Sequence, residues 1–246
     1  MTPFPLPAVP FDGRSRTVAL DSVFDWYRQG WSIFAAHPGH WLLTTLGVVV
    51  GYCLLAALPT VGRPSAQMLL PTLAAGLLLG CRNVATAAVR QASDLLAIPR
   101  GQGPLPWLML GGLYLLCSTA IQRLVALAVE SGAQSAGPST RILDAAPSLG
   151  SWLIAGALEF MLSLPLLMAL LFAPALVVFA RLRPMSALNA SFQACIKNIV
   201  AFLIYGVILL TLGFLAVLPA GLGLLVLVPV LAGSVYAAYR DIFLAT

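Results

Sequence analysis

The sequence predicts an all-α, polytopic membrane protein with six transmembrane helices and two amphipathic helices at the membrane surface. The 246-residue chain is 60% hydrophobic and only 9% charged, which leaves too little polar surface for a water-soluble globule. Its apolar residues form six stretches of about 20 residues, the length that a helix needs to cross the hydrocarbon core of a bilayer. Most arginines lie in alternate gaps between these stretches, as expected of a multi-pass protein.

The six predicted spans are almost continuously apolar, which excludes the alternating strands of a membrane barrel. They cover residues 41–59, 66–84, 105–129, 149–173, 199–218 and 222–239. Residues 1–16 are rich in proline, which predicts a disordered or extended leader. Residues 17–246 are therefore expected to form a single transmembrane helical domain.

The distribution of positive charge predicts the orientation of the chain. Ten of the 13 Lys and Arg residues fall in the N-terminal tail, the second and fourth gaps and the C-terminus. Only Arg63 and Arg141 fall on the other side, and Arg123 lies within the third span. Because basic residues beside a span are retained in the cytoplasm, both termini are predicted to be cytoplasmic. The strong preference for Arg over Lys is typical of GC-rich bacterial genomes and indicates a bacterial inner membrane.

The net charge of +5 predicts attraction to anionic lipid headgroups. No cluster of Lys and Arg is interleaved with exposed aromatic residues, so nucleic-acid binding is not expected. Membrane lipids are thus the predicted partners, together with either another protein or further copies of the chain.

Two amphipathic segments, each directly before a span, are predicted to lie at the headgroup boundary. In residues 20–36 the apolar side chains recur at helical spacing, and they are Leu20, Phe24, Tyr27, Trp31 and Phe34. Residues 185–197 repeat the arrangement with Met185, Leu188, Phe192, Cys195 and Ile196. The two halves are therefore similar in design, and whether they are a true structural repeat stays open.

The fourth apolar stretch is too long for a single straight span, since it runs from about residue 151 to residue 180. Pro165 and Pro174 interrupt it, and each proline removes a backbone hydrogen bond. A kink or break is expected, after which the segment around residues 175–182 is expected to lie along the membrane surface.

Four glycines form a candidate helix-packing motif. Gly47 and Gly51 in the first span, and Gly76 and Gly80 in the second, each have the GxxxG spacing that lets helices approach closely. The two pairs lie at similar depth, so they are expected to face each other in an antiparallel hairpin. Chance spacing of membrane glycines is the alternative.

Arg123 and Glu159 form a candidate intramembrane polar pair in the outer halves of the third and fourth spans. Ionisable groups within hydrocarbon cost a few kcal/mol or more unless they are paired or hydrated. The pair is expected either to line a polar cavity or to act structurally, with Arg123 reaching outward and Glu159 protonated or locking two helices.

A candidate cytoplasmic polar stripe follows the second span. It consists of Arg82, Asn83, Thr86, Arg90 and Asp94, which recur at helical spacing. Such a stripe is suited to a protein partner or to lipid phosphates, and an ordinary solvated helix face has the same pattern.

Enzymatic signatures are missing from the sequence. There is no GxSxG, HExxH or P-loop motif, and the four cysteines are scattered without metal-binding spacing. His37 and His40 are separated by Pro38 and Gly39, which prevents a regular helical metal site. We therefore expect no enzyme activity, no catalytic residue, no cofactor and no metal.

Several segments carry a family resemblance. They are residues 30–34, 172–179, 186–192, 197–198, 223–229 and 233–241. With these segments the chain resembles an uncharacterised proteobacterial family of six-helix, multi-pass inner-membrane proteins of unknown function. The resemblance implies the fold and the location, and it implies no catalytic residue.

These features predict an integral inner-membrane protein with a structural or accessory role, which organises partners or lipids at the cytoplasmic face. The alternative is a small-solute transporter or permease, oligomeric, that uses the region of Arg123 and Glu159. Discontinuous helices such as the proline-broken fourth span occur in transporters, but the polar lining here is thin.

Overall fold

The computed structural model describes residues 15–86, 103–135 and 149–244. Within these ranges the chain forms nine helices and no strand. The helices are α1 (Ser22–Ala36), α2 (Pro38–Ala56), α3 (Gly62–Ala85), α4 (Leu105–Ser135), α5 (Leu149–Leu171), α6 (Ala173–Ala180), α7 (Pro184–Lys197), α8 (Ile199–Val217) and α9 (Leu224–Phe243). Most of the proline-rich leader lies outside the described residues.

Six helical segments of the described chain are long and apolar enough to cross a membrane, which confirms the predicted fold class. They are Pro38–Ala56, Gly62–Ala85, Leu105–Glu130, Trp152–Ala180, Ile199–Val217 and Leu224–Phe243. The fourth segment combines α5 and α6 and continues beyond the predicted end at residue 173. The two amphipathic helices, α1 and α7, are each joined to the following span by one residue, His37 and Asn198.

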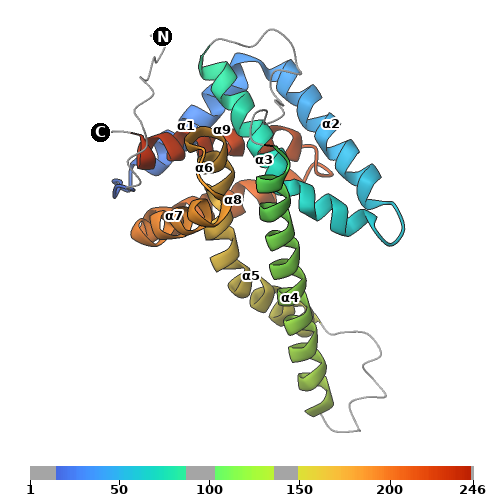
Figure 1. The fold of residues 1–246 in the computed structure, drawn as a ribbon. Helices are drawn as coiled ribbons and strands as arrows, with labels where there is room; N and C mark the ends of the chain where they lie inside the picture. The colour runs from blue at the N-terminus through green and yellow to red at the C-terminus, as the bar shows by residue number, and fades with distance from the viewer. Residues whose placement is uncertain (1–14, 87–102, 136–148, 245–246) are drawn as a thin grey trace.

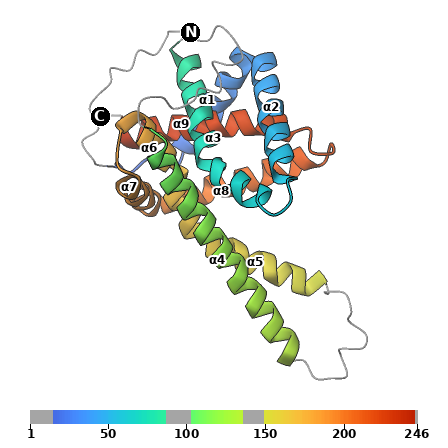
Figure 2. The ribbon, with the colours of Figure 1, turned by 45° about the vertical axis from the view of Figure 1, so that its right-hand side comes forward.

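The helices form a compact body from which one hairpin projects. Figure 1 shows α1, α2, α3, α6, α7, α8 and α9 grouped together, with the outer part of α4 and the first part of α5 extending away from them. The second view shows the same projection (Figure 2). The body therefore contains most of the buried core, and the hairpin is exposed on most sides.

Helix α9 is the most buried of the spans, and α1 packs directly on it. The two helices cross at Gly30 and Gly233. A Cβ atom added at Gly233 would lie 2.8 Å from the Cα of Gly30, and one added at Gly30 would lie 2.8 Å from the backbone nitrogen of Ser234. Only glycine at both positions permits this backbone contact. The crossing makes α1 a part of the core.

The GxxxG motif of α2 does not form the predicted contact. Gly47 and Gly51 are exposed, and a Cβ atom at either would have no neighbour within 4 Å. Gly76 and Gly80 of α3 are buried. The turn between α2 and α3 is instead closed at Gly62, where an added Cβ would lie 3.0 Å from the Cβ of Leu58. The predicted packing of one glycine pair against the other is therefore wrong.

The fourth span bends between α5 and α6, and a serine from α7 bridges the bend. Pro165 lies inside α5 without ending it, whereas the helix is interrupted at Phe172, before Pro174. The Phe172 N–H donates to Ser191 Oγ at 3.0 Å, and the Ser191 hydroxyl donates to the Met168 carbonyl at 2.7 Å. Ser191 thus replaces one hydrogen bond of the helix, as a side chain inserted at a kink does.

The segment after the bend is part of the core. Residues 172–177 are all buried. The Phe172 ring packs against the rings of Phe202 and Phe243, at centroid distances of 5.7 and 5.6 Å. The expectation that this segment lies along the membrane surface is wrong. The bend turns α6 into the body, where α3 and α7 pack against it.

We predict that Gly30→Ala lowers the free energy of unfolding by about 1 to 3 kcal/mol, the usual cost of forcing a group into a packed site. The added methyl group meets backbone atoms of α9 that cannot rotate away. The measurement is thermal unfolding of the detergent-solubilised protein. Gly47→Ala is the matched control, because its methyl group enters open space and alanine favours a helix by about 0.5 to 1 kcal/mol. Equal destabilisation by both substitutions would contradict the assigned packing.

We predict that Ser191→Ala lowers the free energy of unfolding by about 1 to 3 kcal/mol, because the buried Phe172 N–H loses its acceptor. Ser186→Ala on the exposed face of the same helix is the control and should change stability by less than about 0.5 kcal/mol. Thermal unfolding of both variants checks the prediction. Equal stability of the Ser191→Ala variant and the parent would show that the serine does not support the bend.

Candidate functional site

Residues 15–18, which we call the N-terminal strap, tie three distant parts of the chain together. The Arg16 amide donates to the Ile242 carbonyl at 3.0 Å, and the Val18 amide donates to Asn198 Oδ1 at 2.9 Å. Asn198 Nδ2 donates back to the Arg16 carbonyl at 3.0 Å, and the Lys197 ammonium donates to the Ser15 carbonyl. The strap therefore holds the start of α1, the junction of α7 with α8, and the end of α9 at one corner of the body.

Asp241, near the end of α9, is the ionic centre of this corner. Its carboxylate forms an ion pair with the Arg16 guanidinium and accepts a hydrogen bond from Trp26 Nε1 at 3.0 Å. Trp26 is itself buried against Phe202 and Tyr205 of α8. One carboxylate thus connects the strap and the buried face of α1 to α9.

A chain of hydroxyl groups continues from α1 into the body. The Tyr27 hydroxyl donates to the Tyr205 carbonyl at 2.9 Å, and the Tyr27 and Tyr205 rings stack with centroids 4.8 Å apart. The Tyr205 hydroxyl lies 2.8 Å from Ser234 Oγ, next to the glycine crossing. Burial raises the pKa of Tyr27 well above its ordinary value, so this phenol remains a hydrogen-bond donor at physiological pH.

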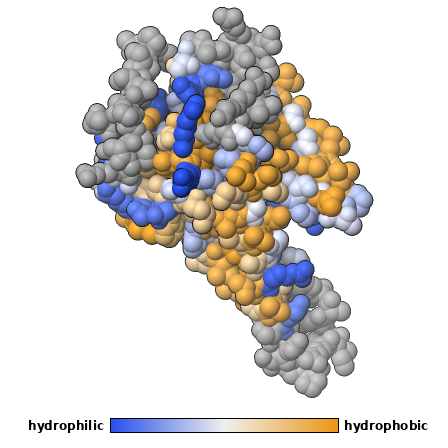
Figure 3. Space-filling model, in the orientation of Figure 1, coloured by the Kyte–Doolittle hydropathy of each residue, from blue (hydrophilic) through white to orange (hydrophobic). Residues whose placement is uncertain are grey.

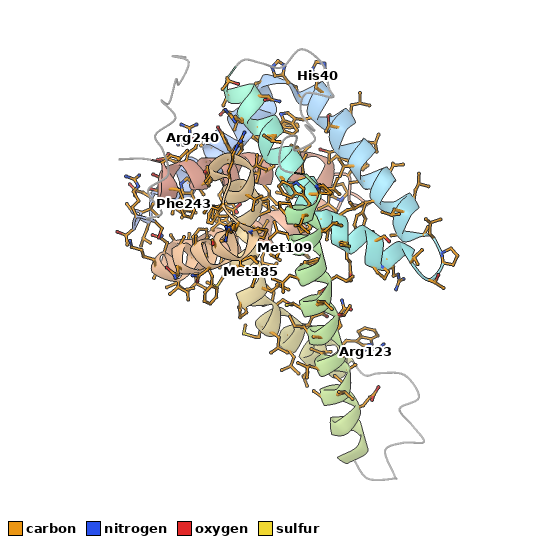
Figure 4. The ribbon with its side chains drawn as sticks, viewed as in Figure 1. His40, Met109, Arg123, Met185, Arg240 and Phe243 are labelled. Carbon is orange, nitrogen blue, oxygen red and sulfur yellow. The ribbon has the colours of Figure 1, made fainter. Side chains whose placement is uncertain are left out.

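The opposite face of α1 and one edge of α7 remain exposed and apolar. We call these side chains the outer stripe, and they are Leu20 directly before α1, Phe24 and Trp31 of α1, and Met185 and Ile196 of α7. The division within α1 is sharp, since Trp26 is 1% exposed whereas Trp31 is 56% exposed. The predicted aromatic face was therefore wrong in part, because Phe34 is buried and Tyr27 is half-buried in the body. Figure 4 shows Met185 on α7.

Exposed basic residues flank the outer stripe. We call Arg28, Arg181 and Arg183 the basic rim, and all three are exposed. Arg28 lies 3.7 Å from Asp25, a loose surface pair, and Arg181 ends α6 in the left-handed conformation with φ of 52°. Cys195, on the buried side of α7, is not a reactive thiol, because burial raises its pKa to about 12. The exposed surfaces of α1, of α7 and of the segment before α7 thus carry apolar and positively charged side chains.

The described part of the predicted cytoplasmic stripe packs against its own helix and against α6. The Arg82 guanidinium lies over the Phe179 ring, 5.7 Å from its centroid, and the Thr86 hydroxyl donates to the Arg82 carbonyl at 3.0 Å. Asn83 is half-buried. Arg90 and Asp94 lie outside the described residues. Arg240 of α9 makes a similar contact with Tyr236, at 5.8 Å, and Figure 4 shows it on the side of the body that carries α1 and α9.

Arg123 and Glu159 are both exposed and do not form an ion pair with each other. The reason lies in the rotation of α4, whose contact face toward α5 carries Gln122, Val125, Ala126 and Val129. These residues, with Glu130, Trp152, Ala155 and Glu159, line a cleft of about 350 Å³. Arg123 is not among the lining residues, so the structure does not show the expected pairing within one chain.

Comparison with known proteins supports the location. The chain is 29% identical over 234 residues to a probable inner membrane protein of the proteobacterium Burkholderia thailandensis, and the match covers 89% of this chain and 82% of that protein. No protein-family profile and no solved structure matches the chain. With the six apolar helices, the similarity confirms the predicted resemblance and shows a multi-pass inner-membrane protein of unassigned function.

The polar residues that organise this inner-membrane protein do not stand out in its sequence. Asp241, Asn198, Ser191 and Ser234 each bind a backbone or side chain far away in the sequence. One signal was available, since each is a polar residue in or directly beside an apolar helix, where an unsatisfied polar group is costly. The partners of these residues could not be inferred from that signal.

We predict that Asp241→Asn loosens the N-terminal strap. Loss of the partly exposed ion pair with Arg16 costs about 1 kcal/mol at most, so the strap should open roughly five-fold more often. Limited trypsin digestion, with mass spectrometry of cleavage after Arg16, measures the opening. Asp25→Asn, which removes only a loose surface pair, is the control. Unchanged cleavage in the Asp241→Asn variant would show that the carboxylate does not hold the strap.

Proposed function

We propose that this protein is a non-enzymatic structural or accessory protein that organises lipids or protein partners at the cytoplasmic face of the inner membrane. Of these two, the surface chemistry favours anionic lipids. The observation that carries the proposal is the outer stripe with its basic rim, an apolar and cationic surface that the body holds in place but does not cover. Trp and other large apolar side chains favour the headgroup boundary, where nearby arginines meet lipid phosphates.

The rigidity of this surface supports an organising role. Helix α1 is fixed by the glycine crossing with α9 and by the contacts of Trp26 and Tyr27 with α8 and α9. Helix α7 is fixed by Ser191, which bridges the bend of the fourth span. A helix that is held at the headgroup layer only by its amphipathic character does not require these contacts with the body. The distribution of Lys and Arg supports a cytoplasmic position for this surface and for both termini.

A small-solute transporter is the second candidate. The observation that favours it is the cleft between α4 and α5, whose lining includes Glu159, Gln122 and Glu130. Against it stands the position of the cleft, because its lining residues belong to the parts of α4 and α5 that project from the body in Figure 1. The first candidate depends on α1 and α7, and the second depends on Glu159.

We predict that phosphatidylglycerol raises the midpoint of thermal unfolding of the detergent-solubilised protein more than phosphatidylcholine does. A ligand that binds only the folded protein stabilises it by mass action. The variant Arg181→Gln with Arg183→Gln should lose half or more of the phosphatidylglycerol-specific shift, and added salt should weaken the shift in the parent protein because it screens exposed charges.

Arg63→Gln is the matched control, because Arg63 is also an exposed arginine but lies at the start of α3, on the predicted opposite side. This variant should keep the full lipid-specific shift. Equal stabilisation by the two lipids would contradict the proposal. An equal loss in the Arg63→Gln variant would show a general charge effect without a role for the basic rim.

A further inference from the structure

The outer part of the α4–α5 hairpin has a surface that nothing in the described chain covers. We call residues 116–130 of α4 and residues 152–162 of α5 the projecting hairpin. Its exposed apolar side chains are Leu116, Leu124, Leu127, Trp152, Leu153, Ile154, Leu158, Phe160, Met161 and Leu162. Figure 3 shows predominantly hydrophobic colour along the hairpin, with hydrophilic side chains toward its outer end. The surroundings of this hairpin are therefore lipid or another protein.

Arg123 and Glu159 occupy equivalent depths on the two arms of the hairpin. Gln122 of α4 and Glu159 of α5 line the same cleft, so the two arms lie beside each other at this level, and Arg123 directly follows Gln122 in α4. Neighbouring helical residues differ in height by only about 1.5 Å, so Arg123 and Glu159 lie at nearly the same level of the hairpin. Figure 4 shows Arg123 on the projecting part of α4.

Neither charge is neutralised within the described part of the chain. Both side chains are exposed, and the ion pairs of the described residues are Arg16 with Asp241 and Arg28 with Asp25. A charge exposed to hydrocarbon at this depth is unfavourable, and such residues usually face a partner or a hydrated cavity. The buried polar groups of the body are largely satisfied, whereas Arg123 and Glu159 lie at the same level of the projecting hairpin without forming an ion pair.

The surfaces around Glu159 and Arg123 differ in shape, and the surface at one residue is complementary to that at the other. Glu159 lies in the open cleft of about 350 Å³ between α4 and α5, together with Glu130. Arg123 is not part of the cleft lining and lies on the flank of α4. The hairpin therefore presents a negatively charged cleft and, beside it, a projecting guanidinium.

We propose that two copies of this chain associate through their projecting hairpins, with Arg123 of each copy entering the α4–α5 cleft of the other and pairing with Glu159. A two-fold axis along the membrane normal keeps every residue at its own depth, so the equal depths of Arg123 and Glu159 permit both pairs at once. Such an interface is isologous, because each surface contains both members of the contact. The apolar side chains around the charges pack between the copies.

This interface goes beyond the proposed function and does not depend on it, since α1 and α7 lie on the body and not on the hairpin. Pairing between two copies would neutralise Arg123 and Glu159, whereas a transport site would leave both side chains accessible to solutes. An Arg123–Glu159 contact between copies closes the cleft to solutes.

The test uses full-length chains with two different affinity tags, co-expressed in bacterial membranes and purified through one tag. Arg123→Glu alone places like charges at both contacts of a self-dimer, and so does Glu159→Arg alone. Each single variant should co-purify with its own kind at least about tenfold less than the parent does with itself, because both close charge pairs change sign together. Arg123→Glu co-expressed with Glu159→Arg should restore association, because both contacts between the two chains are then opposite in charge.

The chain carrying both substitutions tests the same contact without relying on the single variants to fold alone. It should associate with itself, and it should not associate with the parent, because their contacts are Arg with Arg and Glu with Glu. Size-exclusion chromatography of each preparation checks the fold. A monomeric parent would overturn the proposal, and so would free mixing of the parent with the doubly substituted chain. If the single variants misfold, the doubly substituted chain folds, and that chain mixes freely with the parent, then Arg123 and Glu159 pair within one chain and not between copies.

Discussion

The contact between the backbones of α1 and α9, at Gly30 and Gly233, determines how the rest of the body can pack. At this distance Trp26 reaches the Asp241 carboxylate and Tyr27 stacks on Tyr205. A side chain at either glycine would separate the helices and lengthen these contacts together. The strap and the aromatic core therefore depend on the absence of two Cβ atoms, and a helix that is amphipathic in sequence becomes part of the protein core.

Most of the fold could be predicted because its causes are local. The hydrocarbon thickness sets the length of each apolar stretch, and the placement of arginines separates the spans. The packing could not be predicted, since it depends on which faces meet. Helix α1 is apolar on two sides, so its periodicity did not reveal that Trp26 is buried and Trp31 exposed. The GxxxG motif at Gly47 is locally identical to a packing motif, yet the observed close crossing joins glycines from opposite ends of the chain.

The bend in the fourth span shows the same limit at the level of single hydrogen bonds. Two prolines predicted an interruption, and only Pro174 stands beside one, where Ser191 bridges Phe172 and Met168. The proline interrupts the backbone hydrogen bonds of the helix. Ser191 satisfies the Phe172 N–H and the Met168 carbonyl at the interruption, so the bend can be buried. Since Ser191 comes from the following helix, the fold of α6 and the position of α7 are set together, and the segment enters the core.

The polar residues of this protein fall into two groups, which differ in whether they have a binding partner in the described part of the chain. Those of the body, such as Asp241, Asn198 and Ser191, bind backbone or side-chain atoms of the same chain, and so the low-polarity surroundings strengthen their hydrogen bonds. Arg123 and Glu159 form no ion pair in the described chain, although they lie at nearly the same level of the hairpin. A rotation of α4 by one residue would have turned Arg123 toward α5, since successive helical residues point about 100° apart. The observed rotation keeps the arginine outside its own cleft, so neither charge finds a charged partner among the described residues of its own chain.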